Sequence, residues 1–236
     1  MIDWNQELLL VDKPHGITSF DVIRRLRRLY SDTHGGAKAP KLGHAGTLDP
    51  LATGLMLLGV GQGTKKLGEL IKLDKEYITE VRFGETRTTG DLEGEIIDEC
   101  QINDTADTLA AKVLKVLPSM TGTHSLPVSA YSAIKVDGIP MYKRARKAEI
   151  TGDTVINIPV REMTVLAVEL LDVSVGEHRG VATIRFHVAS GTYIRSLAEE
   201  LGRRLGYPAT LQNLRRTEVG KYRVEDACPI EHRKQT

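Results

Sequence analysis

Hydrophobic and polar residues alternate along several segments of the chain, and this alternation predicts β-strands. Two continuous apolar runs near the N-terminus predict further strands that are buried. A polar turn at residues 176–180 predicts that the two longest alternating segments pair antiparallel. The strands predicted from these patterns are 7–11, 55–58, 75–83, 95–100, 131–135, 155–175 and 180–189.

Apolar residues recur at helical spacing in other segments, which predicts helices there. In residues 20–30, four apolar residues share one face and four arginines lie on the other, while Thr18 or Ser19 is placed to cap the helix. The predicted helices are 20–30, 64–73, 104–117, 141–148 and one that ends at Leu205. Strands without a regular βαβ period favour one α/β (α+β) domain, in which helices pack on a large mixed, mostly antiparallel sheet.

The composition is that of an ordinary soluble globular protein, with 236 residues, 41% of them hydrophobic and 27% charged. The formal net charge of +1 does not by itself indicate nucleic-acid binding. Basic residues are, however, clustered along the sequence. The clusters lie within Arg24–Arg28, Lys65–Lys66, Lys143–Lys147, Arg203–Arg204 and Arg215–Arg216. Each cluster alone is more often a solvated face than a phosphate site. Five in one chain favour a basic surface if folding brings them together.

The cysteines and histidines do not predict a metal site. Cys100 and Cys228 lie far apart, no CxxC pair occurs, and the seven histidines show no ligand spacing. The first residues lack the basic n-region of a signal peptide. No apolar run approaches the length of a membrane span. We therefore expect a reduced, cytoplasmic protein.

The stretch from Lys41 to Lys66 contains the strongest candidate for a catalytic group. Asp49 stands between Leu48 and Pro50, after a glycine-spaced loop and before a buried apolar run. Pro50 fixes its own φ and biases Asp49 toward extended backbone, so the carboxylate is stiffly held. Such a carboxylate can act as a nucleophile or general base, although an Asp in a turn is also a common capping residue. The glycines at 59–63 lack the spacing of a phosphate-binding loop.

The sequence GHAGTLDPLATGLMLLGVGQGTK closely resembles the catalytic motif of the TruB family of tRNA pseudouridine synthases, which modify uridine 55 in the T arm. The resemblance implies that Asp49 is the catalytic aspartate, acting as nucleophile at the sugar or as base at C2′. It also implies that His44 lies against the target nucleotide. The implied fold is the pseudouridine synthase fold, with a twisted central sheet and a thumb-like insertion.

Three more segments add site residues under this resemblance. Tyr77 stands in the Lys-Glu-Tyr pattern of the family's active-site tyrosine, whereas a lone strand tyrosine would ordinarily pack in the core. VASGTYIRSLAEELGRRLG resembles the motif whose tyrosine and arginine flank the catalytic acid, which implies these roles for Tyr193 and Arg195. A partly buried carboxylate needs a cation to stay ionised, and an ordinary arginine is disfavoured at a helix start. In LQNLRRTEVG, Leu214 would line the apolar wall of the uracil pocket.

The segment YSAIKVDGIPMYKRARKA resembles the part of the family that leads through the thumb-like insertion, here about residues 125–150, which grips the T stem-loop. The residues suited to phosphate contact are Lys143, Arg144, Arg146 and Lys147. Residues 125–129 depart from the family's Gln and Pro-Pro pair, which leaves the backbone path there open. LLLVDKPHGITSFDVIRRLR resembles the motif that supports the catalytic loop, and we do not predict that Lys13 is catalytic.

The resemblance implies one catalytic domain over residues 1–236, without the C-terminal PUA domain that most relatives carry. It implies tRNA, through its T stem-loop, as the partner of a monomer that needs no cofactor, metal or membrane. Two alternatives stay open: a tRNA-binding RNA chaperone, which is not an enzyme, and, within the enzyme class, a guide-RNA-dependent pseudouridine synthase.

Overall fold

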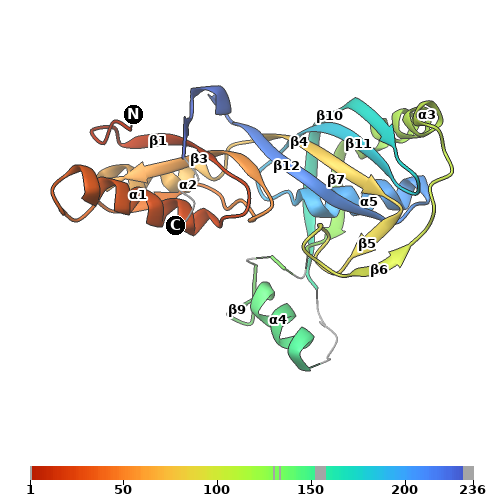
Figure 1. The fold of residues 1–236 in the computed structure, drawn as a ribbon, viewed down its shortest axis with the longest axis horizontal. Helices are drawn as coiled ribbons and strands as arrows, with labels where there is room; N and C mark the ends of the chain where they lie inside the picture. The colour runs from red at the N-terminus through yellow and green to blue at the C-terminus, as the bar shows by residue number, and fades with distance from the viewer. Residues whose placement is uncertain (1, 130, 133, 152–157, 231–236) are drawn as a thin grey trace. The chain divides into compact units, whose positions relative to one another are not determined.

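The computed structural model describes residues 2–129, 131–132, 134–151 and 158–230. The chain divides into two compact units, Met1–Ile78 with Asn213–Thr236 and Thr79–Gln212. Strands β4 (Lys75–Phe83) and β12 (Ala209–Val219) each begin in one unit and end in the other. The two units are described separately below (Figure 1).

The first unit is built on β1 (Leu8–Lys13) and β3 (Thr53–Val60), which pair antiparallel with Leu10 opposite Leu57. Both strands arise from the apolar runs predicted as buried strands, and β3 is buried from Gly54 to Val60. The other elements of this unit are β2 (Leu42–His44), η1 (Gly61–Lys66), α2 (Leu67–Leu70), β13 (Tyr222–Arg223), η3 (Val224–Asp226) and β14 (Cys228–Pro229). The helix predicted at 64–73 is thus a 3-10 turn followed by one short α-helix.

Helix α1 (Ser19–Thr33) belongs to the same unit and starts at a capping box. The Thr18 hydroxyl accepts a hydrogen bond from the backbone N–H of Asp21, whose carboxylate accepts one from the backbone N–H of Thr18. Such reciprocal caps satisfy donors that a helix start leaves open. The helix buries Ser19 together with an apolar face and leaves its arginine face in solvent, as the period predicts.

The second unit packs two helices against antiparallel strands. Strands β10 (Val160–Val175) and β11 (Gly180–Val188) pair as predicted, with Leu170 opposite Ile184, and β7 (Gly122–Pro127) pairs with β10. Residues 155–157, the start of the predicted strand, lie outside the described residues. The two helices are α3 (Ala106–Val116), which continues into the 3-10 turn η2 (Leu117–Met120), and α5 (Ile194–Leu205). A Cβ at Gly180 would lie 2.4 Å from Leu109 Cδ2, so glycine lets α3 approach this strand.

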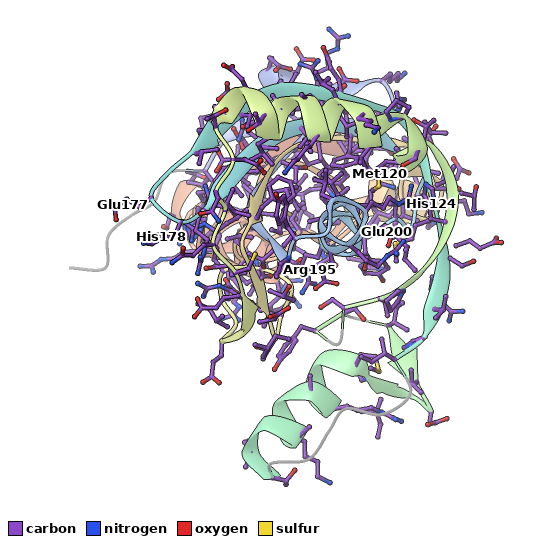
Figure 2. The ribbon with its side chains drawn as sticks, turned by 90° about the vertical axis from the view of Figure 1, so that its right-hand side faces the viewer. Met120, His124, Glu177, His178, Arg195 and Glu200 are labelled. Carbon is purple, nitrogen blue, oxygen red and sulfur yellow. The ribbon has the colours of Figure 1, made fainter. Side chains whose placement is uncertain are left out.

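Helix α5 is tied to β7 through one arginine. Arg204 Nε donates to Glu200 Oε1 at 2.7 Å, and its Nη2 lies 3.2 Å from His124 Nδ1. Figure 2 shows Glu200 and His124 together beside Met120, whose carbonyl lies 2.8 Å from His124 Nε2. Hydrogen bonds from Arg203 and then Arg204 lower the pKa of Glu200 to about 2, so this carboxylate stays charged.

Two parts of the second unit differ from the prediction. The polar loop at 84–94 contains β5 (Glu85–Arg87), which pairs with β6 (Ile96–Glu99). The strand predicted at 131–135 is wrong, because Tyr131 and Ser132 lie in a turn and residue 133 is outside the described residues. Strand β8 (Lys135–Val136) starts later and pairs with β9 (Ile139–Pro140) across the predicted Asp137–Gly138 turn, before helix α4 (Met141–Thr151).

Among the described residues, ten strands form one sheet with the main order β14-β1-β3-β12-β4-β11-β10-β7, while β2 pairs with β3 and β13 with β12. The pairing is mostly antiparallel, and the contacts of β1 with β14 and of β3 with β12 are parallel. This confirms the predicted fold class. No described helix is both long and apolar enough to cross a membrane.

Candidate active site

Asp49 lies half-buried on a loop whose backbone is fixed on both sides. On the N-terminal side, Ser19 Oγ donates to the carbonyl of Leu48 at 2.9 Å and accepts from its N–H at 2.8 Å. Ser19 is the first residue of α1, so the helix start holds the residue before Asp49. Within the loop, the N–H of Ala52 donates to the carbonyl of Asp49 at 3.1 Å.

Lys13 fixes the other side of the loop. Its side chain is completely buried at the end of β1. Its Nζ donates to the carbonyls of Pro50 at 3.2 Å and Ala52 at 2.5 Å, and to that of Pro14 at 3.1 Å. A buried ammonium group is tolerated only when carbonyls or carboxylates surround it. Lys13 therefore joins β1 to the residue after Asp49. The Asp49 carboxylate is thus carried by a backbone whose position is already fixed.

Arg216 binds the start of the same loop from β12. It is 1% exposed, and its guanidinium donates to the carbonyls of Leu55 at 2.7 Å and Gly46 at 3.3 Å. Gly54 has a φ of +104°, and a Cβ there would lie 2.2 Å from the carbonyl oxygen of Arg216, so only glycine fits between the two strands.

His44 stands at the end of β2 in this loop. Burial, and then the positive charge of Arg216, lowers the pKa of His44 below its ordinary value of 6.5. The imidazole is therefore neutral at pH 7. A neutral ring can contact a nucleobase without carrying an unpaired charge into the contact.

Tyr77 and Leu214, the other candidates in the first unit, are both buried. Tyr77 is 7% exposed on the buried face of β4, where burial alternates along the strand, and Leu214 is 6% exposed on β12. Four predicted site residues thus belong to this unit: His44, Asp49, Tyr77 and Leu214. Of these, Asp49 has its backbone fixed by the hydrogen bonds described above.

Arg195 is held by a polar network in the second unit. It is the second residue of α5, 6% exposed, and Figure 2 labels it there. Its Nη1 donates to the carbonyl of Thr89 and to Ser129 Oγ, both at 2.9 Å, and lies 3.7 Å from Asp91 Oδ2. Its Nη2 donates to the carbonyl of Tyr131 at 3.3 Å. The guanidinium is thus oriented from two segments of the unit, the loop that contains Thr89 and Asp91 and the turn that contains Ser129 and Tyr131.

Ser129 is the centre of that network, in the segment that departs from the family pattern. Its Oγ accepts from Arg195 and from the N–H of Tyr131 at 3.2 Å, and it donates to the carbonyl of Thr89 at 3.1 Å. These bonds hold Tyr131 in a turn, which explains why the strand predicted there does not form. Tyr193 occupies the N-cap position of α5, two residues before Arg195, and is half-buried. The predicted pairing of Arg195 with Asp49 joins the two units and stays a prediction.

The four cations predicted to contact phosphate all lie on α4. Lys143 and Lys147 are exposed. Arg144 is partly buried and donates through Nη2 to the carbonyl of Val136 at 2.7 Å and to Asp137 Oδ2 at 2.8 Å, so it ties the helix to the preceding turn. The side chain of Arg146 lies outside the described part of the structure.

Several residues of this site were not predicted from the sequence. Lys13 and Ser19 lie in the segment whose resemblance implies support of the catalytic loop, and Arg216 lies in LQNLRRTEVG, but the sequence does not show which groups they bind. Ser129 gave no signal. Among the described residues, no three His, Cys, Asp or Glu side chains come close enough to hold a metal ion.

Comparison with known proteins identifies the family. The model of the N-terminal domain of the TruB family pseudouridylate synthases matches residues 34–194, which include His44, Asp49, Tyr77 and Tyr193. The tRNA pseudouridine synthase B of Corynebacterium efficiens is 39% identical over 226 residues, covering 96% of this chain and 71% of that protein. The protein of the same name from Leifsonia xyli subsp. xyli is 42% identical over 220 residues, covering 93% and 69%.

Solved structures agree on the fold. A Cbf5-Nop10-Gar1 complex aligns with a TM-score of 0.65 and 20% identity, covering 97% of this chain and 55% of that chain. An H/ACA RNP bound to a substrate RNA containing 2′-deoxyuridine aligns with a TM-score of 0.62 and 21% identity, covering 94% and 50%. This chain therefore spans about half the length of the solved chains, and the likeness shows the fold alone. With the family model and the curated relatives, which match nearly its whole length, it follows that the chain belongs to the TruB family of pseudouridylate synthases.

Proposed function

We propose that this chain isomerises uridine to pseudouridine in tRNA, at position 55 of the T arm. The observation that carries the proposal is Asp49, which lies within the matched residues 34–194 on a loop fixed at both neighbouring residues. The curated relatives that match along nearly the whole chain are named tRNA pseudouridine synthase B, which supports tRNA as the substrate. The T-arm position follows from the sequence motif.

The reaction balances within one nucleotide. The bond between N1 of uracil and C1′ of the ribose breaks, the base rotates while bound, and C5 forms the new bond to C1′. C5 loses its proton, and N1 gains one. Because nothing is oxidised and no group is transferred to another molecule, we propose no cofactor and no metal.

Asp49 acts in this scheme either as a nucleophile at C1′ or as a base that removes a proton from C2′. Both roles require the ionised carboxylate. Arg195 is proposed to keep it ionised, and the network around Ser129 keeps that guanidinium oriented. Tyr77 stacks on the uracil and helps to remove the C5 proton, beside Tyr193 and the apolar wall at Leu214.

The uridine must leave its stack to reach Asp49, at a cost of a few kcal/mol. His44 is proposed to fill the space that the base leaves, which suits a ring that burial keeps neutral.

The two compact units act as one catalytic domain, and residues 125–150 form the thumb-like insertion that binds the T stem-loop. The exposed Lys143 and Lys147 contact its phosphates, and Arg144 and Arg146 lie on the same helix. We propose a monomer that acts in the cytoplasm.

The test is to incubate the protein with an unmodified T-arm stem-loop and to map pseudouridine. We expect product at the position that corresponds to uridine 55, and none from Asp49→Asn, which keeps the shape of the side chain and still binds the RNA. Activity of this variant within tenfold of wild type, about 1.4 kcal/mol of barrier, contradicts the catalytic role. Tight binding without product would favour the RNA chaperone, and a need for an added guide RNA would favour the guide-dependent enzyme.

A further inference from the structure

Helix α1 presents an arginine-rich face that the proposed reaction does not use. Phe20, Arg24, Arg27 and Arg28 are all exposed, and we call them the α1 stripe. Their spacing of four, seven and eight residues from Phe20 puts them on one side of a helix. The opposite side, at Val22, Ile23 and Leu26, is buried. The whole chain has a net charge of only +1, so this positive charge is a local concentration.

Phe20 is the unusual member of the α1 stripe. The chain has three phenylalanines, of which Phe83 and Phe186 are completely buried, whereas Phe20 is 52% exposed. The guanidinium carbon of Arg24 lies 5.1 Å from the centre of the Phe20 ring. An aromatic ring beside arginines on a basic surface is the arrangement on which unpaired bases stack.

The contacts that the α1 stripe makes within the protein contribute little to stability, so they do not explain why these residues are present. An exposed cation–π pair contributes roughly 0.5–1 kcal/mol. The ion pair between Arg24 and Asp21, at 3.3 Å, is exposed on the arginine side and contributes little. Asp21 is already bound by Thr18, in the bonds that lower its pKa, so its carboxylate serves the helix cap.

The position of the stripe connects it to the catalytic loop. Phe20 directly follows Ser19, whose hydroxyl binds the backbone of Leu48, the neighbour of Asp49. The stripe therefore starts beside the loop that carries the carboxylate. From there α1 continues for 15 residues, or roughly 22 Å at 1.5 Å per residue.

We propose that the α1 stripe binds the backbone of the RNA whose uridine enters the Asp49 site. Arg24, Arg27 and Arg28 contact successive phosphates, and one unpaired base stacks on Phe20. This inference rests on the proposed function, since it names a second surface for the same RNA. Arginine suits this role, because its planar guanidinium can bind a phosphate through two hydrogen bonds.

The experiment measures the affinity for the unmodified T-arm stem-loop at several salt concentrations. The stripe variant, with Arg24→Ala, Arg27→Ala and Arg28→Ala, should weaken binding and flatten the slope of log affinity against log salt by roughly 0.7–0.9 for each lost phosphate contact. The same three positions changed to lysine should keep most of the slope. Turnover at saturating RNA should stay within twofold of wild type, because no residue of the stripe touches the reacting atoms.

A matched control removes three other exposed charges, with Lys72→Ala, Lys115→Ala and Lys221→Ala. An unchanged slope in the stripe variant, or equal flattening in the control, overturns the proposal. Phe20→Ala should weaken binding about fivefold or more without changing the slope, while Phe20→Tyr should restore it. All these positions are exposed, so the variants should fold. If the wild type makes no pseudouridine, the proposed function fails, whereas the salt slopes still test the stripe.

Discussion

At the level of residues, the hydroxyl of Ser129 links Arg195 to both segments that orient it. It accepts a hydrogen bond from the guanidinium at 2.9 Å while it donates to the carbonyl of Thr89. A hydrogen bond to a charged group contributes about 1.5–3 kcal/mol, so Ser129→Ala should lower kcat by roughly 10-fold or more. KM should change less, because the RNA contacts remain. Ser129→Thr keeps the hydroxyl and should recover part of the loss in single-turnover assays.

The matched control for Ser129 is Ser132→Ala, in the same turn. The Ser132 side chain is 2% exposed, and its hydroxyl has no hydrogen-bond partner within the described part of the chain. This change removes a buried hydroxyl without touching Arg195. An equal fall of kcat in both variants would assign the effect to packing of the turn instead of to the guanidinium.

His44 should make stability depend on pH. Its pKa is lowered in the folded protein, by burial and then by Arg216, so the unfolded chain binds a proton more readily. The stabilising contribution is therefore complete above the ordinary pKa of 6.5 and is lost as the pH falls through that value. Urea unfolding at pH 7.5 and 5.5 should show a smaller decrease for His44→Asn than for wild type.

At the level of elements, the link from β1 to the catalytic loop depends on Lys13. Lys13→Met keeps the length of the side chain but leaves the carbonyls of Pro50 and Ala52 without this donor. Each buried group that loses its partner costs about 1–3 kcal/mol, so the free energy of unfolding in urea should fall by roughly 3 kcal/mol. Lys66→Met removes an exposed ion pair with Glu7 and should cost less than about 1 kcal/mol. Similar losses in both variants would contradict the role of Lys13.

The elements predicted correctly from the sequence are those that show a clear pattern within their own residues. Strand β4 has the predicted bounds, because its side chains alternate between a buried and a solvent face along its whole length. Helix α1 starts one residue before its predicted range, and its cap is Thr18, one of the two residues predicted for that position. Strand β5 was missed because it has three residues in a polar loop, and β7 was missed because four of its six residues are polar or glycine and its pairing partner lies about forty residues away.

The site was predicted less completely than the fold, for a related reason. Asp49 and His44 belong to one continuous motif and Tyr77 to a second short pattern, Lys-Glu-Tyr, so linear patterns could find them. Lys13 and Arg216 act through carbonyls that lie 39 and 161 residues away along the chain. No local pattern shows which carbonyl a buried cation will meet, so such supporting residues appear only in the folded structure.

At the scale of the whole molecule, a net charge of +1 gives little long-range attraction for RNA. Affinity must then come from local groups of cations. Two groups with exposed side chains are candidates, the α1 stripe in the first unit and Lys143 with Lys147 on α4 in the second. In the other exposed clusters, Lys66 pairs with Glu7 and Arg203 with Glu200. Arg144 is less suited to phosphate, because it is bound to Asp137.

Both groups should hold the same RNA. Lys143→Ala with Lys147→Ala should flatten the salt slope for the T-arm stem-loop by roughly 1.4–1.8, since each neutralised phosphate contributes about 0.7–0.9. Leaving Arg144 in place avoids disturbing the turn before α4. If the two groups bind different phosphates of one RNA, combining this change with the stripe variant should add the two losses in log affinity, as for independent sites. A combined variant no weaker than either parent would contradict this prediction, because it would mean that loss of one group already removes the contribution of the other, so the two groups do not contribute independently to binding.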